Sequence, residues 1–206
     1  YNQTFKIPYD KNIIDRNLSL IQYALKLPLN ITEVQSKAPF LFSSKNFHNA
    51  ALSSRSKNIL IIPGASNASK RYQTSKFAKL ANLIDANIIV IWGDSKEKIL
   101  ANEIKALSPK VIVSDKLSIE SLISLISHVD LVIGPDSGPT HMAWALNIPS
   151  IALFGSTPGY RNSCVTLINH VIQSNSIVNP FKINKKDNSI NDIDSTKIIQ
   201  LVKKLI

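Results

Sequence analysis

Residues 130–155 read DLVIGPDSGPTHMAWALNIPSIALFG, and this stretch decides the fold expected for the chain. Two mostly apolar runs, DLVI (130–133) and SIALFG (150–155), have the length of buried strands. Between them, GPTHMAWALN (138–147) has the length of a short helix, and Pro139 suits its first turn. Apolar strands that alternate with helices are typical of a parallel sheet covered on both faces.

The same alternation continues upstream to residue 58. Three further apolar runs predict strands, and three segments with helical spacing separate them. The predicted strands are 58–62, 87–92 and 111–113, and the predicted helices are 74–84, 96–107 and 118–129. The chain is therefore expected to be an α/β protein with a Rossmann-like, doubly wound parallel sheet.

The flanking segments have a different pattern. Residues 10–25 and 196–206 have helical spacing, and KAPFLF (37–42) favours one further strand. The polar stretch 43–58 is interpreted as a surface connection that enters the α/β unit. Residues 174–191 are rich in Asn, Ser and Lys and are expected to form loops.

The composition excludes several classes of protein. The formal net charge is +10, but its excess lies on the flanks, and no Arg-rich run or basic–aromatic alternation indicates nucleic-acid binding. Scattered surface lysines and a basic face turned toward an anionic membrane or ligand both remain open. No apolar run approaches the ~20 residues that span a bilayer. The single Cys164 suits a reducing compartment, and a start at Tyr1 without a signal-like segment is read as part of a longer protein.

The loop after the strand at 58–62, PGASNASKRY (63–72), resembles a phosphate loop only in part. Gly64 and Lys70 have the spacing of G-x-x-x-x-G-K-[ST], but Ser69 replaces the second Gly and Arg71 replaces the Ser/Thr that binds magnesium. This argues against an ATPase. Backbone amides, the Ser66 hydroxyl and the Lys70 ammonium can still bind phosphate, and a plain solvated loop is the alternative.

Two more strand-to-helix loops carry polar side chains. In WGDSKEK (92–98), either Asp94 or Glu97 can bridge ribose hydroxyls, and helix capping explains the same residues equally well. In GPDSGPTH (134–141), the expected helix N-terminus offers free amides to an anion. A serine hydrolase is excluded because Ser137 lies one position too late for G-x-S-x-G. A simple N-cap by Asp136 or Ser137 remains the alternative.

Metal sites are not expected. Asp192 and Asp194 form a D-x-D, but they directly precede the last predicted helix, where capping is the simpler role. His48, His128 and His170 have no Cys, His or acidic partners at the spacing of metal ligands. Neither a zinc nor an iron site is therefore predicted.

Three stretches together resemble the glycosyltransferase family that includes the ADP-heptose:lipopolysaccharide heptosyltransferases. Residues 130–155 are similar to its signature, IIPGASNASKRY (61–72) with the following helix is similar to its first donor-binding loop, and DRNLSLI (15–21) is similar to the helix before its donor domain. The resemblance implies the GT-B arrangement of two Rossmann-like domains. Residues 1–57 would then be the end of the acceptor domain and the connection, and residues 58–206 the donor-binding domain.

The resemblance also implies roles on the nucleotide side of the site. Ser66 and Lys70 would contact the diphosphate, Glu97 would bind the ribose, and the backbone at Leu117 would read the adenine edge. Ala65 stands where members of the family often have Thr.

On the sugar side, Asp136 would accept hydrogen bonds from heptose hydroxyls. Ser137 and Gly138 would hold the β-phosphate at the helix N-terminus, and His141 would support that turn. The sequence GST (155–157) stands where the family often has GPT.

The implied reaction is transfer of heptose, with inversion, from ADP-heptose to the Kdo–lipid A inner core of lipopolysaccharide. Lys70 would stabilise the leaving ADP without a metal or cofactor, and the catalytic aspartate of the family has no counterpart here, so this part alone should be inactive. The protein is expected to be a monomer on the cytoplasmic face of the inner membrane. Alternatives are a type II heptosyltransferase, a GT-B enzyme with another nucleotide sugar, and a nucleotide-binding module without activity.

Overall fold

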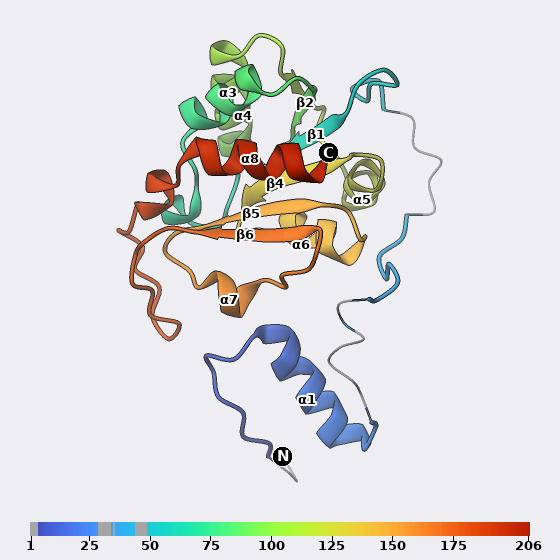
Figure 1. The fold of residues 1–206 in the computed structure, drawn as a ribbon, viewed down its shortest axis with the longest axis vertical. Coiled ribbons are helices and arrows are strands. Elements are labelled where there is room, and N and C mark those ends of the chain that lie inside the picture. The colour runs from blue at the N-terminus through green and yellow to red at the C-terminus, as the bar shows by residue number, and fades with distance from the viewer. Residues whose placement is uncertain (1–3, 29–33, 35, 44–48) are drawn as a thin grey trace.

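The core of the protein is one six-stranded sheet in which every strand is parallel to its neighbours (Figure 1). The computed structural model describes residues 4–28, 34, 36–43 and 49–206. The strand order is β3-β2-β1-β4-β5-β6, and Ile61 pairs with Val90 on one side and with Ile133 on the other. The strands are β1 (Asn58–Ile61), β2 (Asn87–Val90), β3 (Ile112–Val113), β4 (Leu131–Pro135), β5 (Ser150–Phe154) and β6 (Asn169–Gln173).

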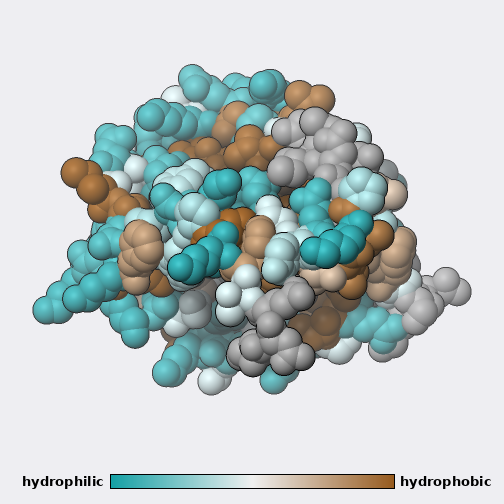
Figure 2. All heavy atoms as spheres, turned by 90° about the horizontal axis from the view of Figure 1, so that it is seen from below, coloured by the Kyte–Doolittle hydropathy of each residue, from teal (hydrophilic) through white to brown (hydrophobic). Residues whose placement is uncertain are grey.

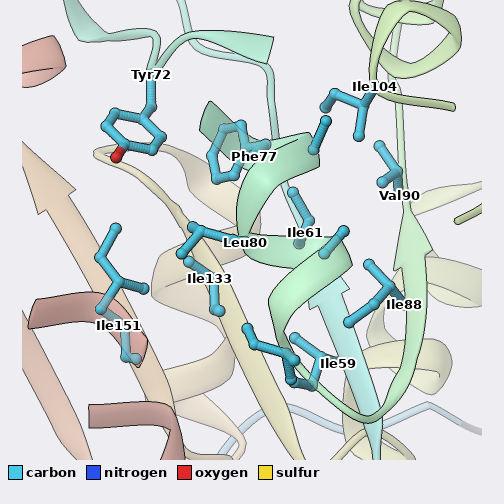
Figure 3. Packing of buried hydrophobic residues seen from close by; sticks show 14 of the residues in the cluster. Ile59, Ile61, Tyr72, Phe77, Leu80, Ile88, Val90, Ile104, Ile133 and Ile151 are labelled. Atoms are coloured by element: carbon cyan, nitrogen blue, oxygen red, sulfur yellow. The ribbon is translucent and has the colours of Figure 1, made fainter. Parts of the chain in front are cut away.

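Helices cover both faces of the sheet, because alternate residues of each central strand point to opposite sides. Ile59 and Ile61 pack under α3 (Thr74–Leu83), α4 (Ser95–Leu107) and α8 (Ser195–Leu205), as Figure 3 shows for α3. Leu60 and Ile62 pack against α5 (Ile119–Ser127) and α6 (Gly138–Ala145) on the other face. Both faces are dry, which explains why the central strands read as continuous apolar runs.

The helix starts follow the polar residues that precede them. Asp94, Ser118 and Asp194 each accept a hydrogen bond from an amide in the first turn of α4, α5 and α8, respectively. These contacts satisfy amides that have no partner within the helix. The predicted capping by Asp94 and by Asp194 of the D-x-D pair is therefore confirmed, and Ser118 has the same role at α5.

The N-terminal segment lies against the carboxyl half of the domain. Asn12 caps α1 (Ile13–Leu25), and its amide also donates to the carbonyl oxygens of Tyr160 and Ser163, at 2.9 and 2.7 Å. Tyr160 lies within α7 (Gly159–Asn162) and Ser163 directly follows it, and α7 lies next to α1 (Figure 1). Within the described residues, no helix combines the length and apolar character needed to cross a bilayer.

One expectation about the flanks is wrong, and one strand was not predicted. The segment 37–42 is not a strand: it runs along α6, and its Phe40 amide donates to the Ala145 carbonyl of that helix at 3.2 Å instead of to a strand. β6 itself was not predicted, since its sequence NHVIQ mixes polar and apolar residues. An edge strand is only partly buried, so it tolerates such a mixture. Residues 174–188 are loops as expected, and η2 (Ser189–Asp192) follows them.

Candidate functional site

A cavity of about 720 Å³ opens at the carboxyl edge of the sheet, where the strand order reverses between β1 and β4. Doubly wound sheets bind ligands at this switch point, because the loops on either side of it diverge. The loops after β1, β2, β3 and β4 all reach the cavity. Its lining includes seven of the eight predicted site residues: Ser66, Glu97, Leu117, Asp136, Ser137, Gly138 and His141.

The eighth residue, Lys70, reaches the same place from η1 (Ala68–Lys70). Its Nζ lies 2.7 Å from Oδ2 of Asp136, and both side chains are largely buried. Lys70 lines a second cavity of about 440 Å³ that shares Asp136 and His141 with the first. The structure thus brings all eight predicted residues together around two adjoining cavities, while their roles toward a ligand stay predictions.

Asp136 is the most highly connected side chain of the site. Oδ2 accepts hydrogen bonds from Lys70 and from the Thr157 hydroxyl, at 2.7 and 3.0 Å, and a longer one from Asn162 Nδ2 at 3.3 Å. Oδ1 accepts one from Nε2 of His141 at 3.0 Å. The carboxylate is 8% exposed. Such a network fixes the orientation of the carboxylate at the mouth of both cavities.

The charge of Asp136 follows from these contacts. Burial by itself raises the pKa of the carboxyl, but the hydrogen bonds from His141 and Lys70 and the positive charge of Lys70 outweigh it, so the pKa lies well below its ordinary value. Asp136 is therefore ionised at neutral pH. A carboxylate only accepts hydrogen bonds, so the proton between it and His141 belongs to Nε2.

The loop after β1 is held in shape by two residues that depart from the phosphate-loop pattern. Ser69 is buried, and the Ser156 hydroxyl lies 3.1 Å from its Oγ. Arg71 donates from Nε and Nη2 to the carbonyl of Ala65, at 3.1 and 3.0 Å, which closes the loop on itself. Ser66 lies between Ala65 and Ser69 in this loop and lines the first cavity.

Glu97, rather than Asp94, faces the cavity. Its Oε2 accepts a hydrogen bond from the Gly93 amide at 2.7 Å, whereas Asp94 is occupied as the cap of α4. A Cβ atom added at Gly64 would lie 2.0 Å from Oε1 of Glu97, so only glycine leaves room for this carboxylate. The carboxylate is thereby held between the loops after β1 and β2.

The N-terminus of α6 is open toward the first cavity. The Ser137 hydroxyl pairs with the Thr140 hydroxyl at 3.1 Å instead of with an amide of the helix. A Cβ at Gly138 would meet nothing within 4 Å, so the backbone is accessible there. Asp136 is bonded to side chains, as described above. The GPDSGPTH stretch is thus more than a capped helix start, and its amides can donate hydrogen bonds to an anion.

Part of the wall of the first cavity is apolar. Leu117, Ile119, Leu122 and Trp92 all line the cavity. The indole nitrogen of Trp92 donates to the Ser114 carbonyl at 2.8 Å, which fixes the ring at the end of β2. A planar apolar group can pack against these side chains, and the Glu97 carboxylate lines the same cavity.

The second cavity contains residues that sequence reasoning missed. Its wall is formed from α1, α6 and the end of α7 by Ile13, Ile14, Trp144, Asn162 and Cys164. Thr157 was likewise missed as a partner of Asp136, although the comparison of GST with GPT had singled out its tripeptide. Residues Ile13, Asn162 and Cys164 carry no local signal, because only the packing of α1 on α7 brings them to the site.

Among the described residues, no three His, Cys, Asp or Glu side chains gather closely enough to hold a metal ion. Nδ1 of His128 lies 2.7 Å from the Ser124 carbonyl at the end of α5, a local contact. His48 lies outside the described residues.

The fold and the site together define a Rossmann-like protein that binds its ligand at the carboxyl edge of a parallel sheet. The chain belongs to glycosyltransferase family 9 (heptosyltransferase), whose sequence profile matches residues 1–189. It is 37% identical over 224 positions to lipopolysaccharide heptosyltransferase 1 of Campylobacter coli, an alignment that covers 100% of this chain and 64% of that protein. The chain therefore spans less than two thirds of the length of this relative.

Two solved structures have the same fold. E. coli heptosyltransferase WaaC, determined with ADP, superimposes with a TM-score of 0.73 at 16% identity, over 100% of this chain and 60% of that chain. E. coli ADP-heptose lps heptosyltransferase II gives a TM-score of 0.72 at 21% identity, over 98% of this chain and 64% of that chain. The predicted doubly wound α/β fold and the predicted family are confirmed.

Proposed function

We propose that this chain is the donor-binding part of a heptosyltransferase that transfers heptose from ADP-heptose to the Kdo–lipid A inner core of lipopolysaccharide. The observation that carries the proposal is the ionised Asp136, held by Lys70 at the junction of two cavities beside the open N-terminus of α6. Membership of the family supports the reaction class. The similarity to a heptosyltransferase 1 favours the type I acceptor.

In this proposal the nucleoside occupies the first cavity. The adenine lies on the apolar wall that includes Leu117, whose backbone reads the base edge, and Glu97 accepts hydrogen bonds from the ribose hydroxyls. The volume of about 720 Å³ is ample for a nucleoside diphosphate. The closeness of Glu97 to Gly93 and Gly64 supports the ribose role, because both backbones leave the carboxylate facing the cavity.

The diphosphate lies between α6 and the loop after β1. The amides near Gly138, the hydroxyls of Ser137 and Ser66, and the ammonium of Lys70 form its positive surroundings. Lys70 is within reach because its Nζ already lies at the junction of the cavities. Positive charge from side chain and amides neutralises the phosphates, so we expect donor binding to persist after metals are removed with EDTA.

The heptose occupies the second cavity. Asp136 accepts hydrogen bonds from its hydroxyls, and Oδ1 retains this capacity because His141 is its one protein partner among the described residues, whereas Oδ2 has three. His141 keeps the carboxylate turned toward the sugar. Residues 58–206 would thus form the donor domain, with α1 of the connecting segment 1–57 closing the sugar end.

The chemistry is a displacement with inversion at the anomeric carbon. The bond from that carbon to the β-phosphate oxygen breaks through an oxocarbenium-like transition state, a bond to the acceptor oxygen forms, and the acceptor hydroxyl gives up its proton to a base. Lys70 and the α6 amides stabilise the charge that develops on the departing ADP. We place the base in a part of the protein outside this chain, so the chain alone should bind donor without transferring sugar.

Calorimetric titration of the chain with ADP, UDP and GDP tests the proposal. We expect ADP to bind most tightly, with unchanged affinity in EDTA. A preference for UDP or GDP would show that the donor is another nucleotide sugar. If none of the three nucleotides binds, the chain is a structural module and not a donor-binding domain. The same proposal includes the Kdo–lipid A acceptor. It also includes a monomeric protein that lies on the cytoplasmic face of the inner membrane.

A further inference from the structure

The loop between β6 and η2, residues 174–189, exposes an unusual set of side chains. Ile177 is fully exposed and Phe181 is 71% exposed, although both are large and apolar. Lysines alternate with the apolar residues along the same loop. The exposed set is Ile177, Phe181, Ile183, Lys182, Lys185 and Lys186. Apolar side chains gathered on one exposed segment indicate a contact surface.

Hydrogen bonds close the base of this loop. The hydroxyls of Ser174 and Ser189 lie 2.8 Å apart, and the Ser176 hydroxyl donates to Oδ2 of Asp187 at 2.8 Å. Oδ1 of Asp187 accepts from the Ser189 amide at 2.8 Å. A segment of this length with its ends tied together is an Ω-loop.

Two asparagines shape the tip of the loop. Asn179 Oδ1 accepts from the amide of Phe181 at 2.8 Å, and Asn184 Oδ1 accepts from the amide of Lys186 at 3.1 Å. Side-chain bonds of this kind fix a turn locally. The exposed apolar and basic side chains are therefore presented by ordered turns.

The charge of the loop is complementary to an anionic surface. Asp187 is the one acid in residues 174–189, and its carboxylate is turned into the base, while the three lysines point outward. Phe181 stacks on Tyr9 at 5.3 Å, and the Arg161 guanidinium lies 4.1 Å above the same Tyr9 ring. The loop lies beside α7 (Figure 1). On the face seen from the α1 side, hydrophobic (brown) and hydrophilic (teal) residues are interspersed (Figure 2).

The loop also lies at the edge of the sheet that carries the site. β6 is parallel to β5 and β5 to β4, so Ser174 leaves the sheet at the same edge as Asp136. We propose that the 174–189 loop binds the surface of an anionic lipid bilayer, with Ile177 and Phe181 entering the headgroup region and the lysines contacting lipid phosphates. This rests on the proposed function, whose acceptor is a glycolipid that must reach Asp136 from a membrane.

Co-sedimentation with vesicles tests the inference on the full 206-residue chain. The vesicles contain phosphatidylcholine alone, or equal parts of phosphatidylcholine and phosphatidylglycerol. One variant is Ile177→Ser with Phe181→Ser, and a second replaces Lys182, Lys185 and Lys186 with Gln. The matched controls alter exposed residues of the same kinds elsewhere: Leu83→Ser with Leu107→Ser, and Lys79, Lys203 and Lys204 to Gln.

We expect the unaltered chain and both controls to bind the anionic vesicles, and either loop variant to lose on the order of tenfold or more in affinity. Equal binding by the loop variants, or no binding by the unaltered chain, would overturn the inference. So would a loop variant that changes self-association while vesicle binding persists, because the loop would then join two copies of the chain. Titration with ADP shows that each variant is folded, and it tests the proposed function separately from the vesicles.

Discussion

Lys70 and Asp136 are 66 positions apart in the chain, yet their charged atoms meet at 2.7 Å at the junction of two cavities. Because β1 and β4 are neighbours in the sheet, the loops that follow them leave side by side. The pair places an ammonium and a carboxylate side by side. A phosphate of the ligand can then contact Lys70 while a sugar hydroxyl of the same ligand donates to Asp136. This arrangement reduces the reorganisation that binding requires.

Replacing Lys70 with Ala should weaken ADP binding roughly tenfold to a hundredfold, because a charge-assisted hydrogen bond contributes about 1.5–3 kcal/mol. Calorimetric titration measures the change, and Lys79→Ala, an exposed lysine on α3, serves as the control. Unchanged affinity in Lys70→Ala would show that the ammonium does not contact the diphosphate.

The depressed pKa of Asp136 makes the stability of the protein dependent on pH. The folded state keeps Asp136 ionised below the ordinary pKa of 3.8, whereas the unfolded chain takes up a proton there. The free energy that this group contributes is therefore fully present above about pH 5 and is lost as the pH falls through 3.8 and below.

Asp136→Asn should accordingly lower the free energy of unfolding by roughly 3 kcal/mol at neutral pH, since it leaves Lys70 without its counter-charge. Urea unfolding of both proteins from neutral to acid pH measures this, and the difference between them should shrink toward low pH. A difference that stays constant with pH would contradict the ionised pair.

Gly64→Ala should displace the Glu97 carboxylate, because the added Cβ would lie 2.0 Å from Oε1. We expect ADP affinity to fall in Gly64→Ala and in Glu97→Ala, and the double variant to be no weaker than Glu97→Ala alone. A double-mutant cycle on ADP affinity measures the coupling. Additive losses would mean that Gly64 acts independently of Glu97.

Substitutions of the two carboxylates after β2, Asp94 and Glu97, should affect different properties of the protein. Asp94→Ala removes the cap of α4 and should cost about 1 kcal/mol of stability with little change in ADP affinity. Glu97→Gln should weaken ADP binding with little change in stability. Thermal unfolding and nucleotide titration of both variants check this, and a loss of ADP binding in Asp94→Ala would reassign the ribose contact.

Cys164 reports on the second cavity. Burial raises the pKa of its thiol, so less thiolate is present at a given pH and alkylation should be slower than for an exposed cysteine. ADP-heptose should slow the reaction further, whereas ADP alone should not, because the sugar is proposed to fill this cavity. Mass spectrometry after timed alkylation measures both rates; equal protection by ADP would place the nucleotide there instead.

Much of this fold was predictable because its signals are local. The apolar runs at 58–62, 87–92, 130–133 and 150–155 predicted four buried strands, and each was found within a few residues of its expected bounds. β6 escaped prediction because an edge strand is half exposed, so its sequence has no continuous apolar run.

The candidate site was predictable to a similar extent. The order of strands and helices placed the loops after β1, β2 and β4 at one edge, and the polar residues of these loops do lie there together. Their roles toward a ligand stay predictions.

The sequence by itself determined which segments become strands and helices and at which edge the polar loops gather, because periodicity and capping act over a few neighbouring residues. Only the tertiary structure decided that Thr157 and Asn162 complete the shell of Asp136, that Arg71 closes the loop after β1, and that α1 walls the second cavity. Most of these contacts join distant parts of the chain, and a pair brought together by packing leaves no pattern in the residues between.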